Sequence, residues 1–378
     1  MTIETRGAGA APAPAEVEVQ IVDTDVHPDP RSMAELREYL PAPWNREVWA
    51  DRIFDASFVA VSPLYVAPGN ARRQDAFPPT GGPPASDPAF AEQQLFHDAG
   101  IDLAMLIPIG GRPMTNPRHE AAVMAAVNNW LAETWLSRYN GYGRYFGTLR
   151  ICSSDPDQAV REIEKWGGHP FFRQVMFDPY VAAPYGQERY RKIFEAAARH
   201  NLVGCMHVGV RRPGTGLLTA VGYVSYFFEY HALYPLLFGT HLLSMVTEGV
   251  FEQFPSLKFA FIEGGFSWLM PLLWRLDKHW SELRSEVPHL KRRPSEYVRE
   301  QVRFTSQPIE EPWNPEDLTR VFDWMDAEHL VMFATDYPHW DGDYDPKHMF
   351  TRLPKHVRQR ILRDNAIELY GLPRTRRA

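Results

Sequence analysis

The sequence predicts an α/β protein, and more specifically a (β/α)8 TIM-like barrel with an insertion after its first strand. Eight short apolar runs are spaced along the 378 residues, and helical patterns lie between most of them. Alternating strands and helices favour a parallel sheet with helices outside it, and eight such units favour closure into a barrel. Acidic residues and histidines stand where several runs end, which is where such barrels place their chemistry.

The apolar runs are short, and most are followed by Gly, Pro or polar residues. Their nearly continuous apolar character is expected of strands that are covered on both faces. The eight expected strands lie in 17–27, 101–111, 145–152, 173–180, 202–210, 257–265, 302–309 and 329–339.

The helical patterns carry recognisable start signals. Asp155 followed by Pro156, and Asn314 followed by Pro315 and Glu316, combine a cap with a first-turn proline. We therefore expect helices within 117–138, 155–166, 186–201, 231–254, 267–283, 314–325 and 354–371.

Two regions interrupt the alternation and define the expected domain organisation. Residues 1–18 are rich in Ala and Pro and predict a flexible N-terminal arm, followed by a single barrel domain over 19–378. Residues from about 29 to 98 are too rich in Pro and Gly for a single helix, which predicts the insertion. The aromatic, Gly-punctuated segment 210–231 is the second interruption. Loops that leave the carboxyl ends of barrel strands form the active-site wall, so both segments are candidates for substrate contacts.

Composition excludes several other classes of protein. Lys and Arg number 40 against 47 Asp and Glu, a formal charge of -7 that predicts no nucleic-acid surface. Proline, glycine and polar residues break the longest apolar stretch, near 233–250, so no membrane span is expected. The N-terminus lacks the basic and apolar regions of a secretion signal. Cys152 and Cys205 lie in apolar segments, which favours reduced thiols and a cytoplasmic location.

Four residues at the ends of three expected strands suggest a metal site. Asp25 and His27 are two apart in a strand and so project from one face, while His207 and Asp336 end two later apolar runs. Taken singly, each has a plainer interpretation: an isolated Asp-x-His is usually a surface pair, and the other two could be a core histidine and a turn residue. Together they form a mixed nitrogen and oxygen set for one divalent ion, for which we expect zinc, with manganese as the alternative.

At this point the sequence resembles a known family. It is similar to the amidohydrolase superfamily, in particular the branch with amino-carboxymuconate-semialdehyde decarboxylase and the nonoxidative aromatic acid decarboxylases, from about residue 21 to 372. The resemblance implies that Asp25 and His27 are the first-strand metal pair, His207 the fifth-strand histidine and Asp336 the last-strand aspartate. It also implies a homodimer. The motifs that carry it are VDTDVH, CMHVG, GVFEQFPSLKFAFIEGG, RFTSQPIEEP, FATDYPHWD and DNAIELYG.

The chain departs from the family pattern at Glu263, where many relatives have a histidine. We expect Glu263 to act as a general acid or base or to bind the metal, although it could instead pair with an arginine or cap the helix that starts near Ser267. Asp336 and His241 are further catalytic candidates, with core packing or an intersubunit contact as the alternatives for His241. The fourth expected strand offers no lysine that could be carbamylated to bridge two metals, which favours a single ion.

Further polar and aromatic residues could contact a substrate or support the ligands. His339 and Asp341 could form a pair that orients Asp336, or be plain loop residues. Arginines bind carboxylates through two parallel hydrogen bonds, and aromatic side chains could form a flat wall for a ring. The arginine candidates are Arg72, Arg73, Arg112 and Arg173, and the aromatic ones are Tyr223, Tyr226, Phe227, Phe228 and Tyr230.

Three functions are compatible with these residues. The leading one is nonoxidative decarboxylation of a small aromatic or unsaturated carboxylic acid, in which Glu263 or His241 supplies a proton to the carbon that loses carbon dioxide. The alternative is hydrolysis of an amide, ester or lactone, in which Glu263 or Asp336 accepts a proton from water. A barrel that binds without catalysis is the third, and the complete set of Asp and His ligands argues against it.

Overall fold

The computed structural model describes residues 16–46, 72–109, 116–208 and 225–377, and its centre is one sheet of eight parallel strands in chain order. All eight strands predicted from the sequence are present, so the prediction of a (β/α)8 barrel is confirmed. The strands are β2 (Val22–Val26), β3 (Leu103–Leu106), β4 (Tyr145–Arg150), β5 (Phe172–Phe177), β6 (Val203–His207), β7 (Phe259–Ile262), β8 (Val302–Thr305) and β9 (Val331–Met332).

Backbone hydrogen bonds between the first and last strands bring the sheet round into a barrel. The N–H of Thr24 donates to the carbonyl of Phe333 at 3.1 Å, and the N–H of His27 donates to Tyr337 at 2.8 Å. An isolated parallel bridge between Val26 and Tyr337 continues this contact. The seam therefore joins β2 to the segment that follows β9, and both carry predicted ligands.

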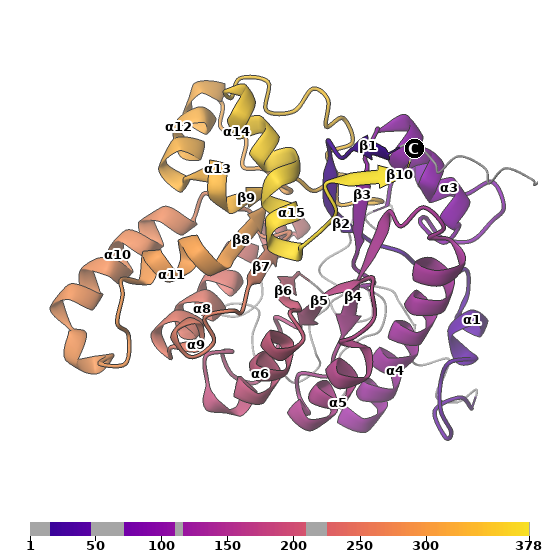
Figure 1. Cartoon of the computed structure of the whole chain (residues 1–378), viewed down its shortest axis with the longest axis horizontal. Helices are drawn as coiled ribbons and strands as arrows, with labels where there is room; N and C mark the ends of the chain where they lie inside the picture. Colours follow the sequence, from indigo (N-terminus) through magenta and orange to yellow (C-terminus); the bar gives the residue numbers. More distant parts are fainter. Residues whose placement is uncertain (1–15, 47–71, 110–115, 209–224, 378) are drawn as a thin grey trace, which may run out of the picture.

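Helices surround the strands, as Figure 1 shows. Asp155 caps α5 through the N–H of Gln158, and Asn314 caps α12 through Glu316, as the sequence predicted. Helices α11 and α13, of eight and four residues, were not predicted, because such short polar segments show little periodicity. The α-helices are α1 (Met33–Arg37), α3 (Pro88–Glu92), α4 (Pro117–Trp130), α5 (Pro156–Trp166), α6 (Arg191–Arg199), α7 (Phe227–His231), α8 (Tyr234–Thr247), α9 (Val250–Gln253), α10 (Leu269–Glu282), α11 (Pro294–Gln301), α12 (Pro315–Met325), α13 (Ala327–Leu330), α14 (Lys355–Gln359) and α15 (Asn365–Tyr370).

Shorter 3-10 and π-helical turns extend several of these helices. The predicted helix over 117–138 is α4 continued by a π-helical segment, and the predicted helix over 354–371 is α14, a π-helical segment and α15 in succession. The turns are η3 (Gln74–Ala76), η4 (Gln93–Asp98), η5 (Leu131–Arg138), η6 (Glu188–Tyr190), η7 (Arg284–Glu286) and η8 (Arg360–Asp364).

Alternate strand residues enter two separate apolar clusters. In β3, Ala104 and Leu106 belong to the cluster between sheet and helices, whereas Leu103 and Met105 belong to a second cluster inside the barrel. This is the period of two expected for a strand covered on both faces. Apolar residues of α15 complete the inner cluster, so this helix closes the amino end of the barrel and leaves the carboxyl end for the site.

The predicted insertion is only partly described. Its residues 47–71 lie outside the described part of the chain, whereas α1 and η3 occupy portions of the rest. The last portion, α3 and η4, buries Leu95 and Phe96 in the outer cluster and so serves as the helix between β2 and β3. The barrel helix therefore begins inside the region assigned to the insertion.

The two ends of the chain meet beside the barrel. Residues 1–15 of the predicted arm lie outside the described part, but Glu16–Glu18 form β1, which pairs antiparallel with β10 (Thr375–Arg377). Cys152 and Cys205 are both buried and form no disulfide. Within the described ranges, no helix is long and apolar enough to cross a membrane.

Candidate metal centre

Five titratable residues meet at the carboxyl end of the barrel. Asp25 belongs to β2 and His27 follows it, His207 ends β6, Glu263 follows β7, and Asp336 lies in the loop after β9. All five are buried, and one potential ligand atom from each lies within 4.8 Å of the others. This separation is close to twice a metal–ligand bond of about 2.0–2.2 Å. The structure therefore brings together all four predicted metal ligands, with Glu263 as a fifth member.

The hydrogen bonds of His27 determine which of its ring nitrogens can bind a cation. Nδ1 lies 2.9 Å from the carbonyl of Ile107, and since a carbonyl only accepts, Nδ1 carries the hydrogen. In the neutral ring Nε2 then has a lone pair, yet it lies 2.8 Å from Asp336 Oδ1 and 3.2 Å from Asp25 Oδ1. Acceptors this close require a cation among them, either a second proton on the ring or a metal ion.

His207 repeats the arrangement from the other side of the barrel. Its Nδ1 donates to the carbonyl of Val208, and its Nε2 lies 3.0 Å from Glu263 Oε2 and 3.5 Å from Asp25 Oδ1. A backbone carbonyl that fixes Nδ1 as the donor and leaves Nε2 for the metal is the usual support of a histidine ligand. Both imidazoles therefore offer Nε2 to the same group of carboxylates.

The cluster carries more negative charge than its own groups can balance. Three carboxylates face two neutral imidazoles, and Asp25 Oδ1 and Oδ2, Glu263 Oε2 and Asp336 Oδ2 have no hydrogen-bond partner among the described residues. Burial and the charge of Asp336 raise the pKa of Glu263 well above its usual range. Burial alone would lower the pKa of His207, but Asp25 and Glu263 raise it well above normal. These groups would take up protons, and a divalent ion would supply the same missing charge, so the residues fit a metal.

Two of the carboxylates stand on strained backbone. Glu263 and Asp336 have φ angles of 59° and 58°, in the left-handed region that residues with a side chain adopt at a cost of roughly 1–3 kcal/mol each. The N–H of Glu263 donates to Thr305 Oγ1 at 3.0 Å, which holds the turn after β7. Strain that surrounding contacts maintain in this way is typical of functional sites.

Two neighbours fix the orientation of the ligands. His339 Nδ1 lies 2.6 Å from Asp336 Oδ1, and burial alone would raise the pKa of Asp336, but His339 and His27 lower it below its usual range. Asp23 accepts the N–H groups of Asp25 and Thr335 at 3.1 and 2.9 Å and the Thr335 hydroxyl at 2.5 Å. Burial raises the pKa of Asp23 to about 7. Sequence reasoning missed Asp23, although its position two residues before Asp25 places it on the same strand face.

The structure separates the alternatives that the sequence left open. Glu263 faces His207, and it is Glu310 that accepts the N–H groups of Phe266 and Ser267 at 3.0 and 3.3 Å before α10. Thus the capping interpretation of Glu263 is wrong. His339 does contact Asp336, but Asp341 lies 3.2 Å from His231 rather than joining His339.

His241 is not part of the cluster. Its Nε2 donates to the carbonyl of Pro179 at 2.9 Å, and its Nδ1 accepts the N–H of Tyr185 at 3.4 Å. Because backbone groups occupy both ring nitrogens, this geometry supports the core-packing interpretation over proton transfer.

The candidate substrate contacts are scattered. Arg72 pairs with Asp29 at 2.7 Å and forms an antiparallel bridge with His339, so it lies beside the cluster, whereas Arg73 is bound to Asp75. Arg173 stands near the amino end of β5, at the opposite end of the barrel, so its prediction as a substrate clamp is wrong. Arg112 and Tyr223 lie outside the described residues, the rings of Tyr226 and Phe228 are exposed, and Tyr230 is buried with its hydroxyl 3.3 Å from that of Tyr180.

Solved structures share this fold over nearly the whole chain. An amidohydrolase from Mycobacterium avium subsp. paratuberculosis is 20% identical with a TM-score of 0.68, covering 94% of this chain and 100% of its own. A 2,6-dihydroxybenzoate decarboxylase from Rhizobium is 17% identical with a TM-score of 0.63, covering 93% and 99%. A 5-carboxyvanillate decarboxylase from Novosphingobium aromaticivorans, complexed with manganese and 4-hydroxy-3-methoxy-5-nitrobenzoic acid, is 18% identical with a TM-score of 0.66, covering 94% and 96%.

Sequence comparison gives the family directly. No significant match is found among curated protein sequences. The sequence model of the family described as Amidohydrolase matches residues 22–372, nearly the range over which the resemblance was recognised. That range contains all eight barrel strands and all five residues of the cluster. The chain therefore belongs to the amidohydrolase family of enzymes.

Proposed function

We propose that this protein is a metal-dependent carboxy-lyase that decarboxylates a small aromatic or unsaturated carboxylic acid without an oxidant. The observation that carries the proposal is a buried cluster in which two imidazole Nε2 atoms face three carboxylates. Both Nδ1 atoms donate to backbone carbonyls, so both Nε2 atoms are left to bind a metal. The similarity to structures described as aromatic acid decarboxylases supports this reaction over others of the family.

Asp25, His27, His207 and Asp336 would hold one divalent ion. Their mixed nitrogen and oxygen set suits zinc, which we propose as the resident metal, and manganese is the alternative because a related decarboxylase was solved with it. When bound, the ion would act as a Lewis acid that holds the substrate carboxylate and a neighbouring oxygen.

Glu263 is the proposed proton donor. Its Oε2 lies 3.0 Å from His207 Nε2, and its side chain is buried at the carboxyl end of the barrel, beside the proposed ligands. A carboxyl group in this place can hold a proton and deliver it to the ring carbon that loses carbon dioxide. His339 keeps Asp336 oriented during this step through its 2.6 Å contact.

Arg72 is the proposed anchor for a second anionic or polar group of the substrate. Its Nη2 binds Asp29 at 2.7 Å, while its buried Nη1 has no hydrogen-bond partner among the described residues. The bridge to His339 places its backbone next to the segment that carries Asp336. A guanidinium beside the buried cluster, with a donor that no described residue occupies, is suited to binding a carboxylate or phenolic oxygen.

The test is an assay of the purified, metal-loaded protein against two panels of compounds. We expect carbon dioxide release from hydroxybenzoate- or muconate-type acids, and its loss after metal removal and recovery after metal is restored. Turnover of an ester or lactone panel with no carbon dioxide release from any acid would replace the proposal with the hydrolase alternative.

We also propose that the protein is a cytoplasmic homodimer. Large exposed aromatic rings support an interface: Trp274 of α10 and Trp324 of α12 are 55% and 61% exposed with ring centroids 6.4 Å apart. Light scattering should give twice the chain mass of 43.4 kDa, and a monomer mass would contradict the dimer.

A further inference from the structure

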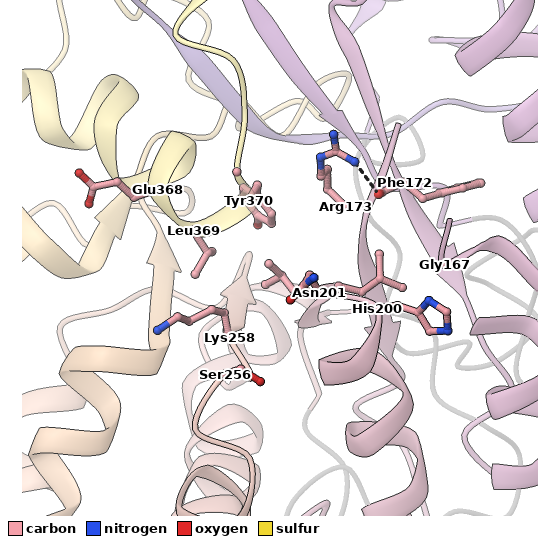
Figure 2. Close-up of a pocket in the computed structure, with 13 residues that line it drawn as sticks. Gly167, Phe172, Arg173, His200, Asn201, Ser256, Lys258, Glu368, Leu369 and Tyr370 are labelled. Atoms are coloured by element: carbon pink, nitrogen blue, oxygen red, sulfur yellow. Dashed lines mark hydrogen bonds between the residues drawn. The ribbon is translucent and has the colours of Figure 1, made fainter. Parts of the chain in front are cut away.

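A cavity of about 390 Å³ lies at the end of the barrel opposite the metal centre. Phe172, Val203 and Lys258 line it from the amino ends of β5, β6 and β7, and the last residues of α15 line it from the other side. Figure 2 shows Arg173 and Lys258 on opposite sides of Leu369 in this view. None of the five residues of the metal cluster contributes to its lining.

Arg173 reaches this cavity as a cation without a carboxylate. Its guanidinium donates one hydrogen bond, from Nη1 to the carbonyl of Phe172 at 3.2 Å, and lies 5.4 Å from the ring centroid of Phe146. Among the described residues, no carboxylate is found to act on the charge of Arg173. Burial lowers the pKa of Arg173, as expected of a half-buried cation with nothing to balance it. Most of its five N–H donors are thus available to a ligand.

Lys258 is a second cation of the same kind. Its Nζ donates to the carbonyl of Glu300 at 3.1 Å. The Glu300 carboxylate is close enough to influence Lys258, but it is bound to Arg292 at 2.6 Å. Lys258 therefore forms no ion pair with a carboxylate among the described residues and brings positive charge to the lining that Glu300 balances only in part.

The other charged residues of the lining are already balanced. Glu368 accepts two hydrogen bonds from Arg360, at 2.6 and 2.9 Å, so both of its carboxylate oxygens are occupied. His200 lies 2.7 Å from Glu164 through Nε2. The charge left over around the cavity is consequently positive.

The remaining lining mixes polar and apolar groups, with Asn201 and Ser256 among the polar ones. Phe172, Leu202, Val203 and Leu369 contribute aliphatic and aromatic surface, and the ring of Tyr370 is buried behind them. A volume near 400 Å³ is at the lower end of the range for small-molecule sites, which combine apolar walls with a few polar anchors. The cavity therefore suits a small ligand whose anionic group meets Arg173 and Lys258 and whose body meets both polar and apolar groups.

We propose that this cavity is a binding site for a small organic anion, an aryl or alkyl carboxylate or phosphate ester, held by Arg173 and Lys258 and separate from the metal centre. The ligand contacts α15 and the amino ends of three strands together. Binding of the ligand therefore holds α15, the helix that closes the barrel, in place against the sheet. This stabilises the folded protein.

The test uses the metal-loaded protein with benzoate and phenyl phosphate as probes, followed by thermal unfolding and titration calorimetry. The His27→Ala variant removes one imidazole of the metal centre, so binding that persists in it reports the amino-end cavity. At a probe concentration of about 100 times Kd, we expect the Tm to rise by roughly 3 °C. Whichever probe binds identifies the anion as a carboxylate or a phosphate.

Arg173→Gln and Lys258→Met should each weaken this binding at least about 10-fold, since each removes one charged hydrogen-bonding group. Arg138→Gln, at a 61% exposed arginine elsewhere, is the matched control and should bind as the wild type does. Ser256→Trp tests the site without changing charge, because Ser256 lines the cavity and a large side chain would fill it. Equal affinity in all four of these variants would overturn the proposal. Loss of all binding in His27→Ala, or failure of both probes to bind, would overturn it as well.

Discussion

The two ends of the barrel carry charges of opposite sign and differ in how fully those charges are buried. At the carboxyl end, the three carboxylates of Asp25, Glu263 and Asp336 face two imidazoles in a buried cluster. At the amino end, Arg173 and Lys258 line a cavity whose rim includes the exposed residue Ser256. Both ends are formed by the strand termini of one sheet. The sign of the charge at each end is therefore set by the side chains there and not by the barrel backbone.

This difference predicts how strongly each end depends on a counter-charge. Unbalanced charge in a closed cluster costs several kcal/mol per ion, so the carboxyl end requires a cation. Unbalanced charge on the partly hydrated cations at the amino end costs far less free energy. We therefore expect this site to bind its anion more weakly than the carboxyl end binds its metal, and the protein to fold without the anion.

The largest effect should follow the loss of one ligand at the carboxyl end. His27→Ala removes one of the two imidazoles and should abolish stable metal binding and lower decarboxylation by at least about 10³-fold, because a metal supplies several kcal/mol of stabilisation. Elemental analysis of the purified variant and carbon dioxide release measure the two effects. His348→Ala is the control, since His348 is 81% exposed and its ion pair is with Asp345, away from the cluster. Full metal content in His27→Ala would contradict the ligand assignment.

The second effect separates chemistry from metal binding. Glu263→Gln keeps the size of the side chain but cannot release a proton, so we expect turnover to fall about 10²–10⁴-fold with the metal retained. The control is Glu310→Gln, at a partly buried carboxylate that accepts the N–H groups of Phe266 and Ser267. It should lower the Tm and leave turnover of the folded enzyme intact. Loss of metal from Glu263→Gln would show instead that Glu263 is a ligand.

Sequence reasoning reached the barrel because eight apolar runs and the helices between them repeat a strong pattern. It found Asp25, His27, His207 and Asp336 because a charged residue that ends an apolar run is conspicuous. It could not find the carbonyl of Ile107, since every residue has one and only the fold selects which carbonyl orients His27. Nor could it find Glu310 as the acceptor of the Phe266 N–H before α10, because these two residues are more than forty positions apart along the chain.

A third effect compares the two ends through matched carboxylates. Asp23→Asn replaces an oxygen that accepts hydrogen bonds from Thr335, so it should cost about 1–3 kcal/mol of stability and weaken metal binding about 10–100-fold. The matched variant at the amino end is Asp102→Asn. One oxygen of the Asp102 carboxylate accepts the N–H groups of Gln20 and Ile21, and the other accepts from Arg376, so the amide can replace only one of these acceptors. This variant should cost similar stability without changing metal affinity. Chelator competition and urea unfolding give the two quantities, and equal metal affinity in both variants would remove Asp23 from the support of the ligands.

The smallest effect concerns a buried histidine that lies outside both charged ends. Burial lowers the pKa of His241 to about 4, against about 6.5 in an unfolded chain. Between these values the unfolded state binds a proton that the folded state does not, so stability falls as the pH falls. Between pH 7.5 and pH 5 the loss of stability should be about 2 kcal/mol.

The control variant is His241→Gln, which keeps an N–H donor for the Pro179 carbonyl and removes the titrating imidazole. Urea unfolding at both pH values should therefore show the wild type losing about 2 kcal/mol more than the variant. An equal loss in both would mean that His241 is not held neutral by burial, and would return it to the candidates for proton transfer.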